Sequence, residues 1–109
     1  HINDLFELVD LQISSLNKIS GNVYNVGGGR SRSLSLLEAT KLCERITGNK
    51  IDIGRDLKNR PGDILIYVTD NKKATVDLDW KPKVSAEDTL SDTFDWIHSN
   101  ECEIKKSLF

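Results

Sequence analysis

Only three short segments of this sequence have the composition of β-strands, and long stretches of other residues separate them. They are residues 22–26 ("NVYNV"), 50–56 ("KIDIGRD") and 64–68 ("ILIYV"). Three short strands with wide gaps between them make a poor independent sheet. We therefore expect a small mixed α/β fold, in which "NVYNV" pairs with strands that lie outside this sequence.

The clearest helix start in the sequence is a capping box, in which Ser35 is followed three residues later by Glu38. Gly48 is expected to end this helix, because glycine tolerates the left-handed conformation after a last turn. Apolar residues recur between them at helical spacing, and Leu37 and Leu42 broaden the stripe. The buried face is expected to comprise Leu36, Ala39, Thr40, Cys43 and Ile46.

Three further helices are predicted from capping residues and apolar spacing. Asn3 or Asp4 is expected to cap a first helix that continues to Gly21. Asp70 is expected to cap a short helix over "NKKATVDLD", and Ser85 a final one that ends near residue 100. The predicted order is therefore helix, strand, helix, strand, strand, helix, helix.

Length and charge limit the classes of protein to which the chain can belong. Its 109 residues fit one domain, which we expect to cover residues 1–100, with a polar tail over residues 101–109. The net charge is −2 and basic residues alternate with acidic ones, so no nucleic-acid partner is expected. No apolar run reaches the roughly 20 residues of a membrane span, so no membrane partner is expected.

The two cysteines, Cys43 and Cys102, are too few and too far apart for a disulfide scaffold or a zinc site. Cys43 lies in an apolar helical stripe, so we expect a buried thiol there. A reducing, cytoplasmic location fits both cysteines, and no metal site is expected.

A glycine-rich loop at residues 27–29 lies between a predicted strand and a predicted helix, which raises the possibility of a cofactor site. Arg32 stands where the third glycine of a dinucleotide-binding motif belongs, and the helix starts several residues too late. A flexible turn is therefore the favoured interpretation, and no cofactor-binding residue is assigned. Catalytic constellations are also missing, so no catalytic residue is assigned.

The sequence "RPGD" places Arg60 and Asp63 on either side of a tight turn. Pro61 favours the second position of such a turn and Gly62 accepts a positive φ at the third. Arginine offers a fork of donors that suits phosphate oxygens, and aspartate offers acceptors for hydroxyl groups. From spacing alone, a surface turn with an ion pair is favoured over a ligand site.

Several stretches taken together resemble one family. "HINDL", "GNVYNVGGG" followed by "SLSLLE", "RPGD", and "LDWKPKVSAEDTL" are similar in order and spacing to the C-terminal part of extended short-chain dehydrogenase/reductase enzymes. These are NAD-dependent nucleotide-sugar epimerases and dehydratases. "SLSLLE" and "DWKPKVSAED" are most similar to CDP-paratose 2-epimerases, with UDP-glucose 4-epimerases as the near alternative. The resemblance extends from His1 to about Asn100.

The resemblance implies that this chain is a nucleotide-sugar-binding fragment and that a missing N-terminal Rossmann domain holds NAD and the catalytic residues. It implies that Arg60 contacts the diphosphate of a CDP- or UDP-sugar, and that Asp63 contacts a ribose. "YNVG" would join the Rossmann sheet, and the parent enzyme would be a homodimer that epimerises its substrate by transient oxidation. The fragment alone would be inactive.

Two departures from the family pattern leave a second hypothesis open. The glycine-rich NAD motif and the Tyr-x-x-x-Lys pair are absent, since Gly28 and Asn71 follow Tyr24 and Tyr67 at the lysine position. The alternative is a non-catalytic interaction module that uses the exposed "NVYNV" edge to bind a partner strand.

Overall fold

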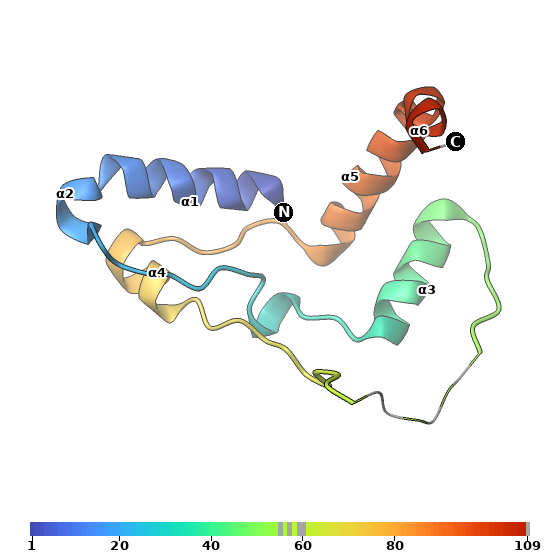
Figure 1. Ribbon diagram of the computed structural model, residues 1–109, viewed down its shortest axis with the longest axis horizontal. Helices are drawn as coiled ribbons and strands as arrows, with labels where there is room; N and C mark the ends of the chain where they lie inside the picture. Colours follow the sequence, from blue (N-terminus) through green and yellow to red (C-terminus); the bar gives the residue numbers. More distant parts are fainter. Residues whose placement is uncertain (55, 57, 59–60, 109) are drawn as a thin grey trace. The chain divides into compact units, whose positions relative to one another are not determined.

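The computed structural model describes residues 1–54, 56, 58 and 61–108, and every regular element in them is a helix (Figure 1). The chain divides into two compact units. Unit 1 comprises His1–Ser33 and Asp52–Val84, and unit 2 comprises Leu34–Ile51 and Ser85–Phe109. The elements are α1 (Ile2–Ser14), α2 (Leu16–Ile19), the 3₁₀ helix η1 (Arg30–Arg32), α3 (Leu36–Thr47), α4 (Lys72–Leu78), α5 (Ala86–Ser99) and α6 (Glu101–Leu108).

The predicted strands are not formed in the described part of the chain. Residues 22–26 and 64–68 have no regular secondary structure, and the same holds for the described residues of 50–56. Val23 is 81% exposed, and every side chain in residues 64–68 is also exposed. A strand is stabilised by hydrogen bonds to a neighbouring strand, and the described residues of these segments do not pair with one another. The described residues therefore form a helical fold, and the α/β prediction is not confirmed.

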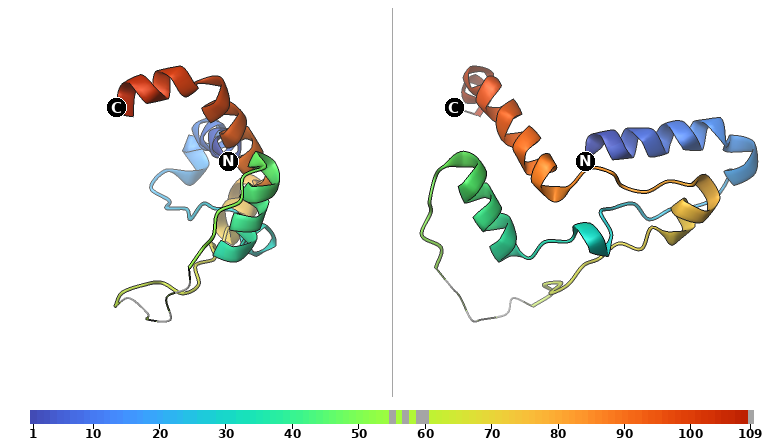
Figure 2. Two further views of the ribbon diagram at one scale, coloured as in Figure 1. Left: turned by 90° about the vertical axis from the view of Figure 1, so that its right-hand side faces the viewer. Right: turned by 180° about the vertical axis from the view of Figure 1, so that it is seen from behind.

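The core of unit 1 lies between α1, α2 and α4, and Figure 2 shows these helices from two further sides. Leu8 and Trp80 are its most completely buried large side chains, with Trp80 only 2% exposed. Burial of one such side chain stabilises a fold by about 1.5–3 kcal/mol. The full cluster is Leu8, Ile19, Ala74, Leu78 and Trp80, with Leu11 and Tyr24 packed against it.

The first helix differs from its prediction at both ends. His1 is the N-cap, and its Nδ1 accepts a hydrogen bond from the backbone N–H of Asn3 at 3.1 Å. Asp4 therefore lies inside α1, where it is buried. The helix also ends at Ser14, because Ser15 leaves the helical conformation (ψ 12°) before the short α2 begins. One continuous helix as far as Gly21 is thus wrong.

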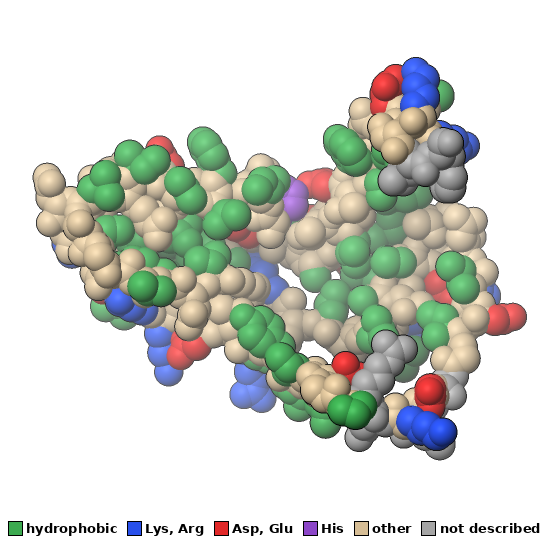
Figure 3. Space-filling view, viewed as in Figure 1, with side chains coloured by type: hydrophobic (Ala, Val, Ile, Leu, Met, Phe, Trp, Pro, Cys, Tyr) green, Lys and Arg blue, Asp and Glu red, His purple; other side chains and the backbone are tan. Residues whose placement is uncertain are grey.

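The outer face of α1 is apolar and exposed. Phe6 is 72% exposed, and Ile2 and Ile13 are also well exposed. Figure 3 shows hydrophobic side chains along the length of this helix. An exposed apolar face of this kind is typical of an interaction surface.

The predicted capping box at Ser35 and the predicted cap at Ser85 are both confirmed. The backbone N–H of Glu38 donates to Ser35 Oγ at 3.2 Å, and the backbone N–H of Ser35 donates to Glu38 Oε2 at 2.8 Å. Ser85 forms the same box with Asp88 at the start of α5. Gly48 ends α3 in the left-handed conformation (φ 70°), as expected.

The buried face of α3 is only partly the predicted one, since Ala39, Thr40 and Ile46 are half-buried. Leu42 is its buried residue, whereas Leu36 is 86% exposed and the thiol of Cys43 is also exposed. Apolar residues cover a wide arc of this helix, so their spacing could not indicate which side packs against α5. Arg45 Nη2 and Glu87 Oε1 join α3 to α5 at 3.2 Å. The residues expected to be a polar tail form α6.

Candidate functional site

The Arg60–Asp63 turn is only partly visible, because Arg60 lies outside the described residues. Pro61 and Gly62 form a turn, and Gly62 has the positive φ (88°) expected from the sequence. Asp63 is exposed and has no hydrogen-bond or ion-pair partner among the described residues. The proposal that both side chains reach one ligand therefore stays a prediction.

The glycine loop is fixed to the segment in front of α4 by the side chain of Asn71. The backbone N–H of Gly27 donates to Asn71 Oδ1 at 3.2 Å, and Asn71 Nδ2 donates to the Gly27 carbonyl at 2.6 Å. A Cβ atom at Gly27 would lie 2.4 Å from Thr69 Oγ1, so only glycine fits there. Gly29 adopts a positive φ of 67°. The loop is therefore an ordered part of unit 1 and not the flexible turn favoured by the sequence.

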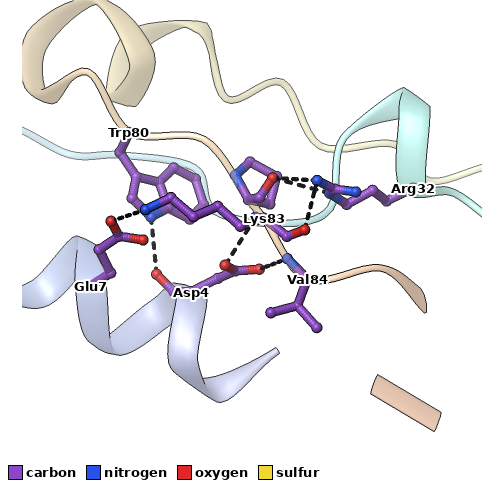
Figure 4. A network of polar contacts seen from close by, with 7 residues as sticks. Asp4, Glu7, Arg32, Trp80, Lys83 and Val84 are labelled. Atoms are coloured by element: carbon purple, nitrogen blue, oxygen red, sulfur yellow. Dashed lines mark hydrogen bonds and ion pairs between the residues drawn. The ribbon is translucent and has the colours of Figure 1, made fainter. Parts of the chain in front are cut away.

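Arg32 attaches the other end of this loop to the segment after α4. Its Nε and Nη2 donate to the Pro82 carbonyl at 3.1 and 2.7 Å, and Nη2 also donates to the Lys83 carbonyl at 3.0 Å (Figure 4). Hydrogen bonds from a charged donor stabilise a fold more than neutral ones do. The residue that breaks the dinucleotide-binding motif in the sequence thus has a structural role.

Asp4 connects α1 to the same segment (Figure 4). Its two carboxylate oxygens accept hydrogen bonds from the backbone N–H groups of Lys83 at 2.9 Å and Val84 at 3.1 Å. Its backbone carbonyl accepts one from Trp80 Nε1 at 3.0 Å, and Lys83 Nζ pairs with Glu7. The "HINDL", "GGGRSR" and "DWKPK" stretches are therefore joined in one polar network.

This network was not predicted from the sequence, although the sequence contains one indication of it. Asp4 lies four positions before the apolar Leu8, so it shares the inward face of α1. A carboxylate on an inward face is rarely buried without hydrogen-bond donors. No spacing rule could have named Lys83 and Val84 as those donors, since they lie 79 and 80 positions away.

A pocket of about 640 Å³ opens in unit 1 between the glycine loop and α4. It is lined by residues 28–32, 68–72, 75–76 and 81–82. The Asn71 and Arg32 contacts described above fix two of its walls. Asp70 lies at the pocket, and its carboxylate accepts a hydrogen bond from the backbone N–H of Lys72 at 2.9 Å. The N-cap of α4 is Asn71, so the predicted cap at Asp70 is wrong by one residue.

Tyr24 lies beside a lysine in space but lacks the properties of a catalytic base. Its hydroxyl donates to Asp77 Oδ2 at 2.9 Å, and Lys73 Nζ lies 4.8 Å from the centroid of its ring. Burial raises the pKa of the Tyr24 phenol, and the hydrogen bond and negative charge of Asp77 raise it further. The phenol therefore remains protonated near neutral pH and joins α4 to the segment after α2.

The glycine loop does not fit NAD. A dinucleotide site needs a strand, a glycine turn and a helix whose N-terminus faces the pyrophosphate. Here the loop leads into η1, and the polar backbone groups of Gly27 are bound by Asn71. Among the described residues no cluster of His, Cys, Asp and Glu could hold a metal ion, and none of their helices could cross a membrane.

Comparison with known proteins finds similar chains among enzymes of nucleotide-linked sugars. The chain is 40% identical to CDP-paratose 2-epimerase of Salmonella typhi over 100 residues, which are 91% of this chain and 29% of that protein. It is 31% identical to UDP-glucose 4-epimerase of Bacillus subtilis over 106 residues, 91% of this chain and 30% of the relative.

A third relative carries a different activity in its name. The chain is 30% identical to dTDP-glucose 4,6-dehydratase of Streptomyces niveus over 92% of its length, which is 29% of that protein. The chain thus spans less than a third of each of these three relatives. No family model and no solved structure matches it.

Proposed function

The chain is related to the C-terminal part of extended short-chain dehydrogenase/reductase-type nucleotide-sugar epimerases and dehydratases, and we propose that it is the substrate-binding part of such an epimerase. Its substrate would be a CDP- or UDP-sugar. The observation that carries the proposal is the 40% identity to CDP-paratose 2-epimerase across 91% of the chain.

In the proposed site, the Arg60 guanidinium binds the diphosphate of the nucleotide sugar and the Asp63 carboxylate binds a ribose hydroxyl. Two features support this assignment. The positive φ of Gly62 is what a tight turn between them requires, and the exposed Asp63 carboxylate is available to a ligand. Binding energy from the remote nucleotide would hold the sugar in its reactive position.

We propose that the parent enzyme holds NAD in an N-terminal Rossmann domain, works in the cytoplasm and forms homodimers. NAD would supply transient oxidation of the sugar, with return of the hydride after the intermediate has changed its configuration. The apolar outer face of α1 is a surface that such a domain could cover. The 109-residue chain alone would then bind nucleotide sugars without converting them.

The alternative function, a partner-binding module that offers the "NVYNV" edge, has less support. Lys73 Nζ already donates to the Val23 carbonyl at 3.1 Å, and directly after the segment the Asn71 side chain occupies both backbone groups of Gly27. Part of that edge is therefore used within unit 1 and is not free to pair with another strand.

Calorimetric titration of the 109-residue chain with CDP-glucose and UDP-glucose would test the proposed site. We expect weak binding of at least one of them, and Arg60→Ala should weaken it tenfold or more, since a charge-assisted contact to phosphate is lost. Arg45→Ala, which removes an exposed arginine of α3, is the matched control and should bind as the unchanged chain does.

Two results would contradict the proposal. Equal affinity of the Arg60→Ala and Arg45→Ala variants would remove Arg60 from the site. Tight binding of NAD to the 109-residue chain would show that the assignment of NAD to a separate domain is wrong.

A further inference from the structure

We propose that the pocket between the glycine loop and α4 is a second anion site, which binds a phosphate or diphosphate group separately from the Arg60–Asp63 turn. This inference goes beyond the proposed function, which places the substrate diphosphate on Arg60. Asp63 is not among the residues that line the pocket, so the two sites have different side chains.

The pocket is lined by far more positive charge than the composition of the chain predicts. The chain has a net charge of −2, yet Arg30, Arg32, Lys72 and Lys81 line the pocket with Asp70 as the one carboxylate. Clefts lined by charge of one sign concentrate the field and raise the local concentration of ions of opposite charge. A ligand with at least two negative charges matches this lining.

Three of these cations are available to a ligand. The side chains of Arg30, Lys72 and Lys81 make no hydrogen bond or ion pair with other described residues, and all three are exposed. Arg32 differs, because its guanidinium already donates to the carbonyls of Pro82 and Lys83. Arg32 therefore holds the wall of the pocket, while the other three provide the charge.

The pocket is also shaped before any ligand arrives. The hydrogen bonds between Asn71 and Gly27 fix one wall, and those from Arg32 to Pro82 fix another. Residues 28 and 29 present backbone without side chains, so a phosphate group could approach their N–H groups closely. A volume of about 640 Å³ lies within the range of small-molecule sites, which is roughly 300–1,000 Å³.

The test is a titration of the ¹⁵N-labelled 109-residue chain with pyrophosphate at constant ionic strength, followed by the amide signals. We expect saturable shifts at Gly28 and Gly29, and at Lys72 on the opposite wall. The Arg30→Gln/Lys81→Gln double variant should raise the Kd at least tenfold. Each glutamine keeps a polar, unbranched side chain, somewhat shorter than the original, and removes its charge.

Three controls make the outcome decisive. Lys41→Gln, at an exposed lysine of α3, should leave the Kd for pyrophosphate unchanged. Arg60→Ala removes the proposed diphosphate contact of the turn, so it should leave only the shifts at Gly28, Gly29 and Lys72, and the Kd read from them, unchanged. Shifts that sodium chloride reproduces at the same ionic strength would overturn the proposal, as would an equal loss of affinity in Lys41→Gln. Loss of pyrophosphate binding in Arg60→Ala would show that the anion binds the turn and that there is no second site.

A parallel titration with CDP separates this proposal from the proposed function. Pyrophosphate binding that depends on Arg30 and Lys81, together with CDP binding that is unaffected by Arg60→Ala, would support the second site and contradict the nucleotide site.

The amide spectrum also shows whether the double variant folds. If it does not, the single Arg30→Gln and Lys81→Gln variants should each raise the Kd for pyrophosphate at least threefold.

Discussion

Asp4→Ala should strongly destabilise unit 1, because it removes the acceptor for two backbone N–H groups. Asp4 is 6% exposed, and its carboxylate binds the N–H groups of Lys83 and Val84 at 2.9 and 3.1 Å. The bond from Trp80 Nε1 ends on the backbone carbonyl of Asp4, so the variant retains it.

The expected magnitude follows from the number of these bonds. A hydrogen bond to a charged group contributes about 1.5–3 kcal/mol, and a buried donor without a partner costs about 1–3 kcal/mol. The two donors are only partly buried and share one carboxylate, so we expect a total loss of about 2–4 kcal/mol in the free energy of unfolding. This is a large fraction of the roughly 5–15 kcal/mol that stabilises a typical domain.

Tryptophan fluorescence can report on unit 1 by itself. Trp80 belongs to the core of unit 1, whereas Trp96 lies on α5 of unit 2 and is exposed. In a Trp96→Phe background, the fluorescence signal in a urea titration therefore follows the unfolding of unit 1. Separate signals matter because two compact units need not unfold in one transition.

The control is Asp10→Ala on the same helix. Asp10 is exposed, so this variant makes the same chemical change without removing a buried acceptor. Any gain in helix propensity from alanine is common to both variants. A loss in Asp4→Ala that lies within about 0.5 kcal/mol of the loss in Asp10→Ala, the usual range for surface substitutions, would refute the reasoning.

Two further predictions concern the glycine loop and the start of α3. Gly27→Ala should destabilise unit 1 by about 1–3 kcal/mol in the same urea assay, because its Cβ would overlap Thr69; Gly54→Ala, whose Cβ has open space, should have little effect. Hydrogen bonds from the Ser35 hydroxyl and backbone N–H lower the pKa of Glu38. The pKa of Glu38 is lower in the folded state than in the unfolded state, so the ionised carboxylate stabilises the fold. This stabilisation is complete above the unfolded-state pKa and is lost as the pH falls through the folded-state pKa. Ser35→Ala should raise the pKa of Glu38 toward its ordinary value in an NMR titration, and an unchanged value would contradict the capping box.

Local chemistry made the helix ends of unit 2 predictable from the sequence. The capping boxes at Ser35 and Ser85 and the left-handed Gly48 depend only on neighbouring residues, and each formed as expected. The buried side of α3 could not be predicted in the same way. Its apolar arc allowed either Cys43 or Leu42 to face the neighbouring helix, and only tertiary packing selected Leu42.

The predicted strands failed for a different reason. Residues 64–68 have a strand-like composition, but composition describes a preference for a pleated, half-buried surface and supplies no partner strand.

The candidate site was also predictable only where it depends on neighbouring residues. The turn at Gly62 formed as expected. The pocket, in contrast, depends on the contact of Asn71 with Gly27, 44 positions away in the sequence, and on that of Arg32 with Pro82, which is 50 positions away.

The long separation between Asp4 and its two donors also affects how this molecule is made. The residues of α1 leave the ribosome well before residues 83 and 84 are added. The nascent helix therefore waits with its carboxylate without donors and with Leu8 lacking Ala74, Leu78 and Trp80. Contacts that close so long a loop form slowly, and uncovered apolar surface favours association with other chains in the meantime. Chaperone binding to the newly made chain should therefore persist until the second half of unit 1 has emerged.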